Sequence, residues 1–120
     1  MKLYLTHASS YDYEVELYEP LKKSLAKEND IFFPHDEHEE GVASKDIIST
    51  CDAVIAEVSY PSTGQGIELG WADAHDIPII CLYREDAKPS GALQYISNNL
   101  VEYHSSEDMI EKLRVEINNL

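Results

Sequence analysis

Basic residues are scarce in this sequence. Its 120 residues include nine lysines and arginines against 23 aspartates and glutamates, so the formal net charge is −14. Nucleic acids and anionic membranes are bound through clusters of positive charge that neutralise phosphate groups. The composition therefore argues against a nucleic-acid polymer or an anionic membrane as the partner. It leaves a small ligand open, even a phosphorylated one, because such a ligand needs only local amides, hydroxyls and a helix N-terminus.

Cysteine is scarce as well, and no apolar run is long enough to cross a membrane. Cys51 and Cys81 lie in or beside apolar stretches and lack metal-ligand spacing, so we expect two buried, reduced thiols. The apolar segment at residues 3–5 is too short for a signal peptide. These absences predict a cytoplasmic location. His35 and His38 stand three residues apart in an acidic segment, but no further ligand has a defined spacing, so we expect neither a metal nor another cofactor.

Apolar runs alternate with helical patterns along the chain. The sequence predicts strands at residues 2–6, 31–33, 52–58, 78–83 and 100–103, and helices at residues 17–26, 44–50, 65–75 and after Ser105. The acidic residues 36–41 are expected to form a loop. Pro20 suits only a first helical turn, so the first helix should begin near Leu17 or kink there.

The alternation also predicts the architecture. With 43% hydrophobic residues, the chain has enough apolar material for one packed core. Nearly continuous apolar strands between helices indicate a parallel sheet that is covered on both faces. We predict that residues 1–120 form a single α/β domain with a doubly wound, five-stranded parallel sheet of the flavodoxin-like or Rossmann-like kind.

In such sheets, ligands bind at the carboxyl ends of the strands, where the strand order reverses. Residues 6–13 and 58–66 follow the first and third expected strands and should meet there. The second segment contains Gly64 and Gly66, which allow a sharp turn and a close approach of the backbone to a ligand. Their amides would point into the crevice from the start of the next helix.

Glu68 follows this turn and is the candidate reactive residue. In the first turn of a helix that begins at Gln65, the helix dipole favours the ionised carboxylate that a nucleophile needs. The residues expected to pack on the sheet are Ile67, Gly70, Trp71 and Ala74. Glu68 should therefore face the pocket. Taken alone, the pattern is also that of an ordinary helix start, and the turn matches neither a phosphate loop nor a dinucleotide fingerprint.

Several segments together carry a family resemblance. They are Lys-Leu-Tyr-Leu at residues 2–5, Cys-Asp-Ala-Val-Ile-Ala-Glu-Val at 51–58, Pro-Ser at 61–62, Gly-Gln-Gly-Ile-Glu-Leu-Gly at 64–70 and Ile-Cys-Leu-Tyr-Arg at 80–84. In this order they resemble the nucleoside 2-deoxyribosyltransferase family. Within it, they are most similar to the Rcl-like branch of 2'-deoxynucleoside 5'-monophosphate N-glycosidases.

The resemblance implies a retaining reaction at the N-glycosidic bond. Glu68 would attack C1' of the deoxyribose and form a covalent glycosyl ester, which water or a second base then resolves. Tyr4 corresponds to a tyrosine beside the nucleophile, although a half-buried strand aromatic is an equal alternative for it. Ser62 corresponds to a serine that contacts the 5'-phosphate, and Ser90 lies near a position that completes the pocket of a neighbouring subunit. A homodimer is expected on this ground.

The chain departs from the family in two places. Counting without a gap, the family's aspartate that acts on the leaving base falls on Ser44, and Asp46 takes its place only if the helix is shifted. The loop at residues 6–12 has neither the arginine nor the glycines of the family's phosphate-binding loop, so His7 and Ser9 are its candidate ligand contacts. The choices between deoxynucleoside and monophosphate, and between hydrolysis and transfer, stay open.

These features predict cleavage or transfer of the N-glycosidic bond of a small deoxynucleoside or deoxynucleotide. One alternative is a nucleotide-binding domain of the same fold that has lost catalysis along with the helix acid. Another is a flavodoxin-like or receiver-like signalling domain. That domain would need an acidic cluster or a flavin phosphate loop after the first strand, and residues 6–10 provide neither.

Overall fold

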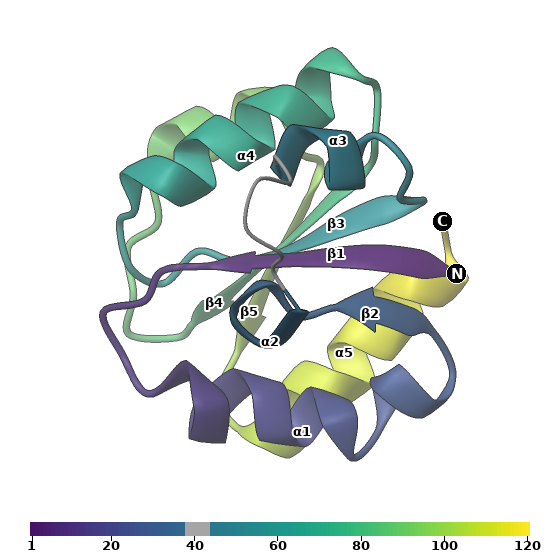
Figure 1. Cartoon of the computed structure of the whole chain (residues 1–120). Coiled ribbons are helices and arrows are strands. Elements are labelled where there is room, and N and C mark those ends of the chain that lie inside the picture. The colour runs from purple at the N-terminus through teal and green to yellow at the C-terminus, as the bar shows by residue number, and fades with distance from the viewer. Residues whose placement is uncertain (38–43) are drawn as a thin grey trace.

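The computed structural model of the protein describes residues 1–37 and 44–120, and it contains one five-stranded sheet (Figure 1). The strands are β1 (Lys2–His7), β2 (Asp30–Phe32), β3 (Ala53–Glu57), β4 (Ile79–Arg84) and β5 (Asn99–Tyr103). Their order is β2-β1-β3-β4-β5, and every neighbouring pair is parallel. The predicted flavodoxin-like sheet is therefore confirmed. The strand order reverses between β1 and β3, which locates the ligand crevice expected for such sheets.

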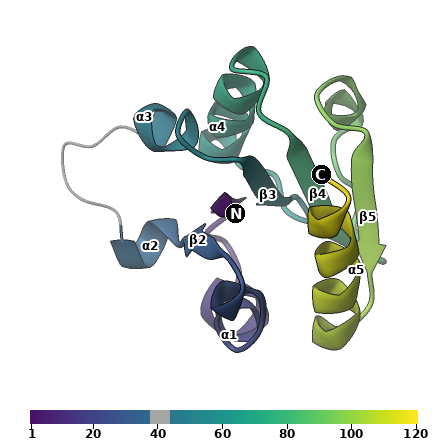
Figure 2. The same cartoon turned by 90° about the vertical axis from the view of Figure 1, so that its right-hand side faces the viewer.

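Helices cover both faces of the sheet (Figures 1 and 2). The helices are α1 (Glu19–Lys22), α2 (Pro34–Glu37), α3 (Ser44–Ile48), α4 (Thr63–Ala74) and α5 (Ser106–Asn118). Strand side chains alternate between the faces: Leu3 and Leu5 pack in the core beneath α1 and α5, whereas Tyr4 packs in the core beneath α3 and α4. Each central strand is thus buried on both sides, as its continuous apolar sequence predicted.

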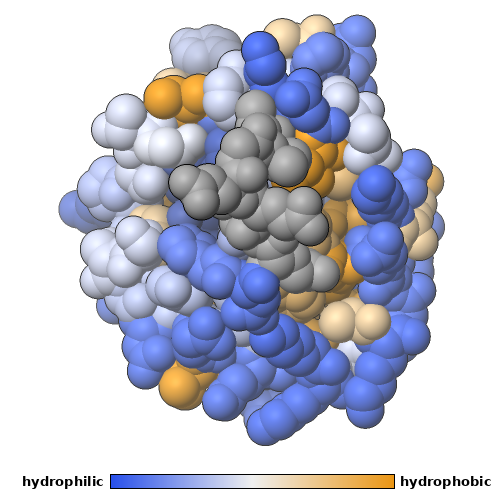
Figure 3. All heavy atoms as spheres, in the orientation of Figure 1, coloured by the Kyte–Doolittle hydropathy of each residue, from blue (hydrophilic) through white to orange (hydrophobic). Residues whose placement is uncertain are grey.

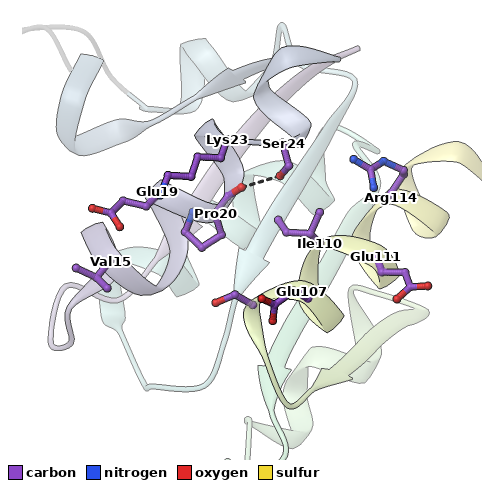
Figure 4. Close-up of a pocket in the computed structure, with 10 residues that line it drawn as sticks. Val15, Glu19, Pro20, Lys23, Ser24, Glu107, Ile110, Glu111 and Arg114 are labelled. Atoms are coloured by element: carbon purple, nitrogen blue, oxygen red, sulfur yellow. Dashed lines mark hydrogen bonds between the residues drawn. The ribbon is translucent and has the colours of Figure 1, made fainter.

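Pro20 determines the shape of the first helical segment, which begins earlier than Leu17. A π-helical turn spans Glu14–Tyr18, and the amide of Glu19 donates to the carbonyl of Glu14. Pro20 then stands in the first turn of the short helix α1, where its missing N–H is tolerated. A surface groove of about 640 Å³ lies between α1 and α5. Pro20 and Ile110 are among the residues that line it (Figure 4).

Helix α4 begins two residues before the position expected from the sequence. Ser62 caps it, and the Ser62 hydroxyl accepts a hydrogen bond from the amide of Gln65 at 3.3 Å. Glu68 consequently lies in the second turn of α4 rather than the first. The prediction that the helix dipole acts on Glu68 from the first turn is therefore wrong, because that effect fades within one turn.

The buried face of α4 also differs from the expectation. The residues predicted to pack on the sheet are exposed or half-buried, and Ile67 is 50% exposed. The buried positions are instead Gln65, Leu69 and Ala72. The prediction failed because it placed every large apolar side chain against the sheet, whereas Ile67 and Trp71 line a cavity.

The remaining elements agree largely with the sequence. Helix α5 begins after Ser105, as predicted, and the Ser105 hydroxyl caps it by accepting a hydrogen bond from the amide of Asp108 at 3.1 Å. Cys51 and Cys81 are free and buried, and burial raises the pKa of Cys81 to about 11. The expected loop at residues 36–41 is wrong at its start, because α2 extends through Glu37, and its other residues lie outside the described part. Among described helices, none is long and apolar enough to cross a membrane.

Candidate active site

A cavity of about 540 Å³ lies at the carboxyl end of β1, beside α3 and α4. The described residues that line it are Tyr4, His7, Pro34, His35, Ser44, Gly64, Ile67, Glu68 and Trp71. Four predicted site residues therefore meet here: Tyr4, His7, Gly64 and Glu68. On the face of the molecule drawn in Figure 3, hydrophilic residues predominate.

Two hydroxyl groups of β1 hold the carboxylate of Glu68. The Tyr4 hydroxyl donates a hydrogen bond to Oε2, and the Thr6 hydroxyl donates to Oε1 at 2.9 Å. Tyr4 and Thr6 are two residues apart on one strand, so their side chains point to the same face of the sheet. Each carboxylate oxygen thus accepts one hydrogen bond, and the two bonds together restrict the orientation of the carboxylate group. Thr6 was not predicted as a site residue, although its spacing from Tyr4 was a usable signal.

Tyr4 acts as a donor in this arrangement. Burial, and then the adjacent Glu68 carboxylate, raise the pKa of Tyr4 well above its usual range, while a hydrogen bond with Ser44 opposes this shift. Tyr4 therefore keeps its proton at neutral pH. Its ring is stacked on Phe32 with 5.3 Å between the ring centroids, which restricts the direction of the hydroxyl.

Gln65 joins α4 to the two strands at the point of strand-order reversal. Its side-chain amide donates to the carbonyl of Thr6 at 3.2 Å and to the carbonyl of Glu57 at 2.7 Å. Only 5% of Gln65 is exposed, so this amide fills the space between the ends of β1 and β3. The bonds position the first turn of α4 and hence Glu68, one turn later. The sequence analysis assigned Gln65 only to the start of the helix and predicted no role for its side chain.

His7 is buried and neutral. Its exposed fraction is 7%, and burial lowers its pKa below the ordinary value. Nδ1 lies 2.8 Å from the carbonyl of Ala8, which can only accept, so Nδ1 carries the hydrogen. Nε2 lies 2.8 Å from the hydroxyl of Tyr18 and accepts from it. The rings of Tyr13 and His35 lie 4.6 and 5.1 Å away, measured between centroids.

The other predicted residues do not reach Glu68. Ser62, Gly66 and Ser90 line a separate cavity of about 700 Å³ on another flank of α4. Asp46 and Ser9 are exposed and line neither cavity. At the position where the family resemblance implies an acid, the cavity of Glu68 has the hydroxyl of Ser44.

No metal site emerges from the part of the chain that the structure describes. Within residues 1–37 and 44–120, no three histidine, cysteine, aspartate or glutamate side chains are grouped so that they could hold a metal ion. His35 lines the cavity of Glu68, but His38, its companion in the sequence, lies outside the described residues.

Comparison with known sequences points to one family. The chain matches the family model described as nucleoside 2-deoxyribosyltransferase over residues 5–118. A curated Trichoplax adhaerens protein named 2'-deoxynucleoside 5'-phosphate N-hydrolase 1 is 31% identical over 111 residues, covering 78% of this chain and 77% of that protein. A Methanosarcina barkeri protein of the same name is 36% identical over 72 residues, covering 58% of this chain and 45% of that protein.

Solved structures share the fold. A CMP N-glycosidase from Clostridium botulinum superposes with a TM-score of 0.72 at 23% identity, covering 95% of this chain and 99% of that chain. A conserved protein from Enterococcus faecalis V583 gives a TM-score of 0.65 at 19% identity, covering 97% and 98%. At these identities, the likeness concerns the architecture of the chain.

Acid should destabilise the fold through His7. The unfolded chain has the ordinary histidine pKa of 6.5, and the folded chain has a lower one. The unfolded state therefore binds the proton first, so the stability that neutral His7 contributes is complete above about pH 6.5 and is lost as the pH falls below it. Urea unfolding at a series of pH values should show a shallower decline for His7→Gln than for the wild type.

The exposed His75 provides the matched control for this measurement. His75→Gln should keep the pH dependence of the wild type. Parallel decline of the wild type and His7→Gln between about pH 7 and pH 5 would contradict the assignment of this effect to His7.

Proposed function

Because the chain belongs to the nucleoside 2-deoxyribosyltransferase family, we propose that it is an enzyme that cleaves or transfers the N-glycosidic bond of 2'-deoxynucleosides or their 5'-monophosphates. The observation that carries this proposal is the Glu68 carboxylate, which two hydroxyls hold at the wall of a cavity beside the strand-order reversal. A fixed carboxylate at a cavity wall suits attack on the anomeric carbon of a bound sugar.

The reaction would proceed in two displacements at C1' of the deoxyribose. In the first, a Glu68 oxygen forms a bond to C1', the bond from C1' to the base nitrogen breaks, and the base leaves with the electron pair and takes up a proton. In the second, water or another base attacks C1', the bond between C1' and the Glu68 oxygen breaks, the attacking group releases a proton to solvent, and the Glu68 carboxylate is restored. Two inversions at C1' retain the configuration of the sugar. Tyr4 and Thr6 position the carboxylate for the first displacement.

Trp71 is the proposed contact for the nucleobase. It follows Glu68 by three residues on α4, so both side chains lie on one face of the helix, and both line the cavity. An indole ring offers a flat apolar surface on which a base stacks favourably. Ile67 extends this apolar wall.

Departure of the base requires a proton donor near the base nitrogen. Apart from Glu68, the described wall of the cavity contains no carboxylate, and Ser44 can donate a hydrogen bond but is a poor acid. Glu57 is buried, and its carboxylate accepts from the Tyr103 hydroxyl and from the Ser59 amide, so it is engaged elsewhere. Asp46 remains the candidate acid, provided that α3 moves. The same deficit favours the second candidate function, a nucleotide-binding domain without catalysis.

Base release measured by chromatography tests the proposal. Glu68→Ala should lower kcat by roughly 10³-fold or more, because the nucleophile is lost. Thr6→Val should lower kcat roughly tenfold with little change in KM, because the carboxylate loses one of its two restraints. Thr6→Ser keeps the hydroxyl and should stay close to the wild type.

Further outcomes separate the alternatives. A second base added to the assay distinguishes transfer from hydrolysis, and mass spectrometry of the quenched protein detects a deoxyribosyl adduct on Glu68. Unchanged turnover in Glu68→Ala contradicts the proposed role. Thermal stabilisation by nucleotides without released or exchanged base, across all the common deoxynucleosides, establishes the binding domain instead.

Substitutions at two positions of α3, Ser44 and Asp46, test which group protonates the leaving base. Ser44→Asp should raise kcat by about tenfold or more, because a carboxylic acid at the cavity wall can protonate the base. Ser44→Asn is the uncharged control. If Asp46 serves as the acid, Asp46→Asn lowers kcat by a similar factor in the wild-type background. Equal activity of Asp46→Asn and the wild type removes Asp46 from the mechanism.

We also propose a cytoplasmic homodimer in which the single domain formed by residues 1–120 pairs through the region of Ser90. Tyr95 is 81% exposed, and Leu100 on the edge strand β5 is exposed as well, which suits an apolar contact. In such a dimer, Ser90 of one copy would contribute to a pocket of the other. Ser62 and Gly66, which line the same cavity as Ser90, and the exposed Ser9 are the further proposed substrate contacts. Light scattering after size exclusion should give about twice 13.6 kDa, and Tyr95→Glu, unlike Val115→Glu on α5, should favour the monomer. A 13.6 kDa wild-type species contradicts the dimer.

A further inference from the structure

Helix α2 brings a second ionisable side chain to the cavity of Glu68. Pro34 and His35 line the cavity from α2, whereas Glu68 and Trp71 line it from α4. Helix α2 follows β2 and α4 follows β3, and these two strands lie on either side of β1. A ligand that fills the space between the two helices therefore meets the carboxylate and the indole on one side and an imidazole on the other.

Aromatic groups determine the position of His35. Its ring lies 4.8 Å from that of Tyr13 and 5.1 Å from that of His7, measured between centroids, and both pairs are tilted by 36°. Its backbone amide donates a hydrogen bond to the hydroxyl of Tyr18 at 3.3 Å. Contacts from two other elements thus hold His35 in place, although its side chain is exposed. A group that transfers a proton to a bound ligand needs such a fixed position.

The two neighbouring histidines differ in their hydrogen bonds. Both ring nitrogens of His7 are engaged, since Nδ1 donates to the Ala8 carbonyl and Nε2 accepts from the Tyr18 hydroxyl. In the part of the chain that the structure describes, no hydrogen bond engages a ring nitrogen of His35. Burial, and then the charge that His35 carries when protonated, lower the pKa of His7. A proton added to this pair therefore goes to His35.

His35 is the described residue of this cavity that can give and take a proton near neutral pH. Tyr4 keeps its proton, because burial and the Glu68 carboxylate raise its pKa. On the helix of His35 itself, Asp36 is paired with Lys22. The described titratable groups that face His35 from other elements are His7, Tyr13, Tyr18, Tyr4 and Glu68.

We propose that His35 is the proton donor for the leaving base, an inference that rests on the proposed function. As the bond from C1' to the base breaks, the protonated imidazole gives its proton to the base, which leaves as a neutral molecule. As water then attacks C1' and the ester bond to Glu68 breaks, the neutral imidazole takes up the proton that the water loses. His35 is thereby protonated again, and it supplies the acid that the position of Ser44 lacks.

Substitution of His35 tests the inference in a base-release assay. His35→Gln should lower kcat by about 10²-fold, because the base must leave without a general acid. His75→Gln, at an exposed position near the end of α4, should keep the wild-type kcat. Wild-type kcat in His35→Gln, together with a large loss in Glu68→Ala, overturns the inference and leaves the proposed function intact. A wild type that releases no base from any deoxynucleoside or deoxynucleotide overturns both.

Pairs of substrates with different leaving groups separate acid catalysis from a structural role. 7-Methylguanine leaves more readily than guanine without a proton, and 5-fluorouracil leaves more readily than uracil. The loss of kcat in His35→Gln should be at least about tenfold smaller for the better leaving group of the pair that the wild type cleaves. This ratio does not depend on the fraction of protein that is folded. Equal losses for both members of the pair contradict the inference.

The pH profile of base release in a single turnover provides a second readout. The wild-type rate should fall as the pH rises through the range in which histidines lose their proton, about pH 5 to 8, because the neutral imidazole has no proton to donate. His35→Gln should lack this alkaline decline. Addition of Ser44→Asp to His35→Gln should recover about tenfold in rate, whereas Ser44→Asn should recover none. An unchanged decline in His35→Gln, or equal rates in the two double variants, overturns the inference.

Discussion

Strand β1 contributes three groups that hold α4 in place: the hydroxyls of Tyr4 and Thr6 and the carbonyl of Thr6. The hydroxyls bind the Glu68 carboxylate, and the carbonyl binds the side-chain amide of Gln65. All three attachments are to a strand in the middle of the sheet, which β2 and β3 support on either side. The position of the candidate nucleophile therefore derives from the most constrained part of the fold rather than from a surface loop.

The two carboxylates near the site, those of Glu68 and Glu57, accept hydrogen bonds from hydroxyl groups. Glu68 is held by Tyr4 and Thr6, and the buried Glu57 is held by Tyr103 and Ser59. Hydroxyl groups satisfy the hydrogen-bonding capacity of a carboxylate without bringing a positive charge to it. This pattern agrees with the acidic composition of the whole chain.

Most of the fold could be predicted from the sequence, but only part of the candidate site could. The five strands and their order followed from continuous apolar runs and from the rules of parallel sheets. The choice of Glu68 and Tyr4 depended on the family resemblance, since local pattern alone left both roles open. Thr6 and Gln65 escaped prediction because their roles depend on contacts between β1 and α4, whose residues lie about 60 positions apart in the sequence. The buried face of α4 was misassigned because Gln65, a polar residue, enters the core by binding two carbonyls.

The alternation of side chains along β1 has a consequence for folding. The spacing that directs Leu3 and Leu5 into one core also directs Tyr4 and Thr6 toward Glu68. Displacement of β1 by one residue would turn its leucines to the opposite face of the sheet and move both hydroxyls away from the carboxylate. A chain that reaches its correct core has therefore already organised the support of its reactive residue. Misfolded forms with a shifted strand would lose packing and chemistry together, so none of them would retain a partial activity.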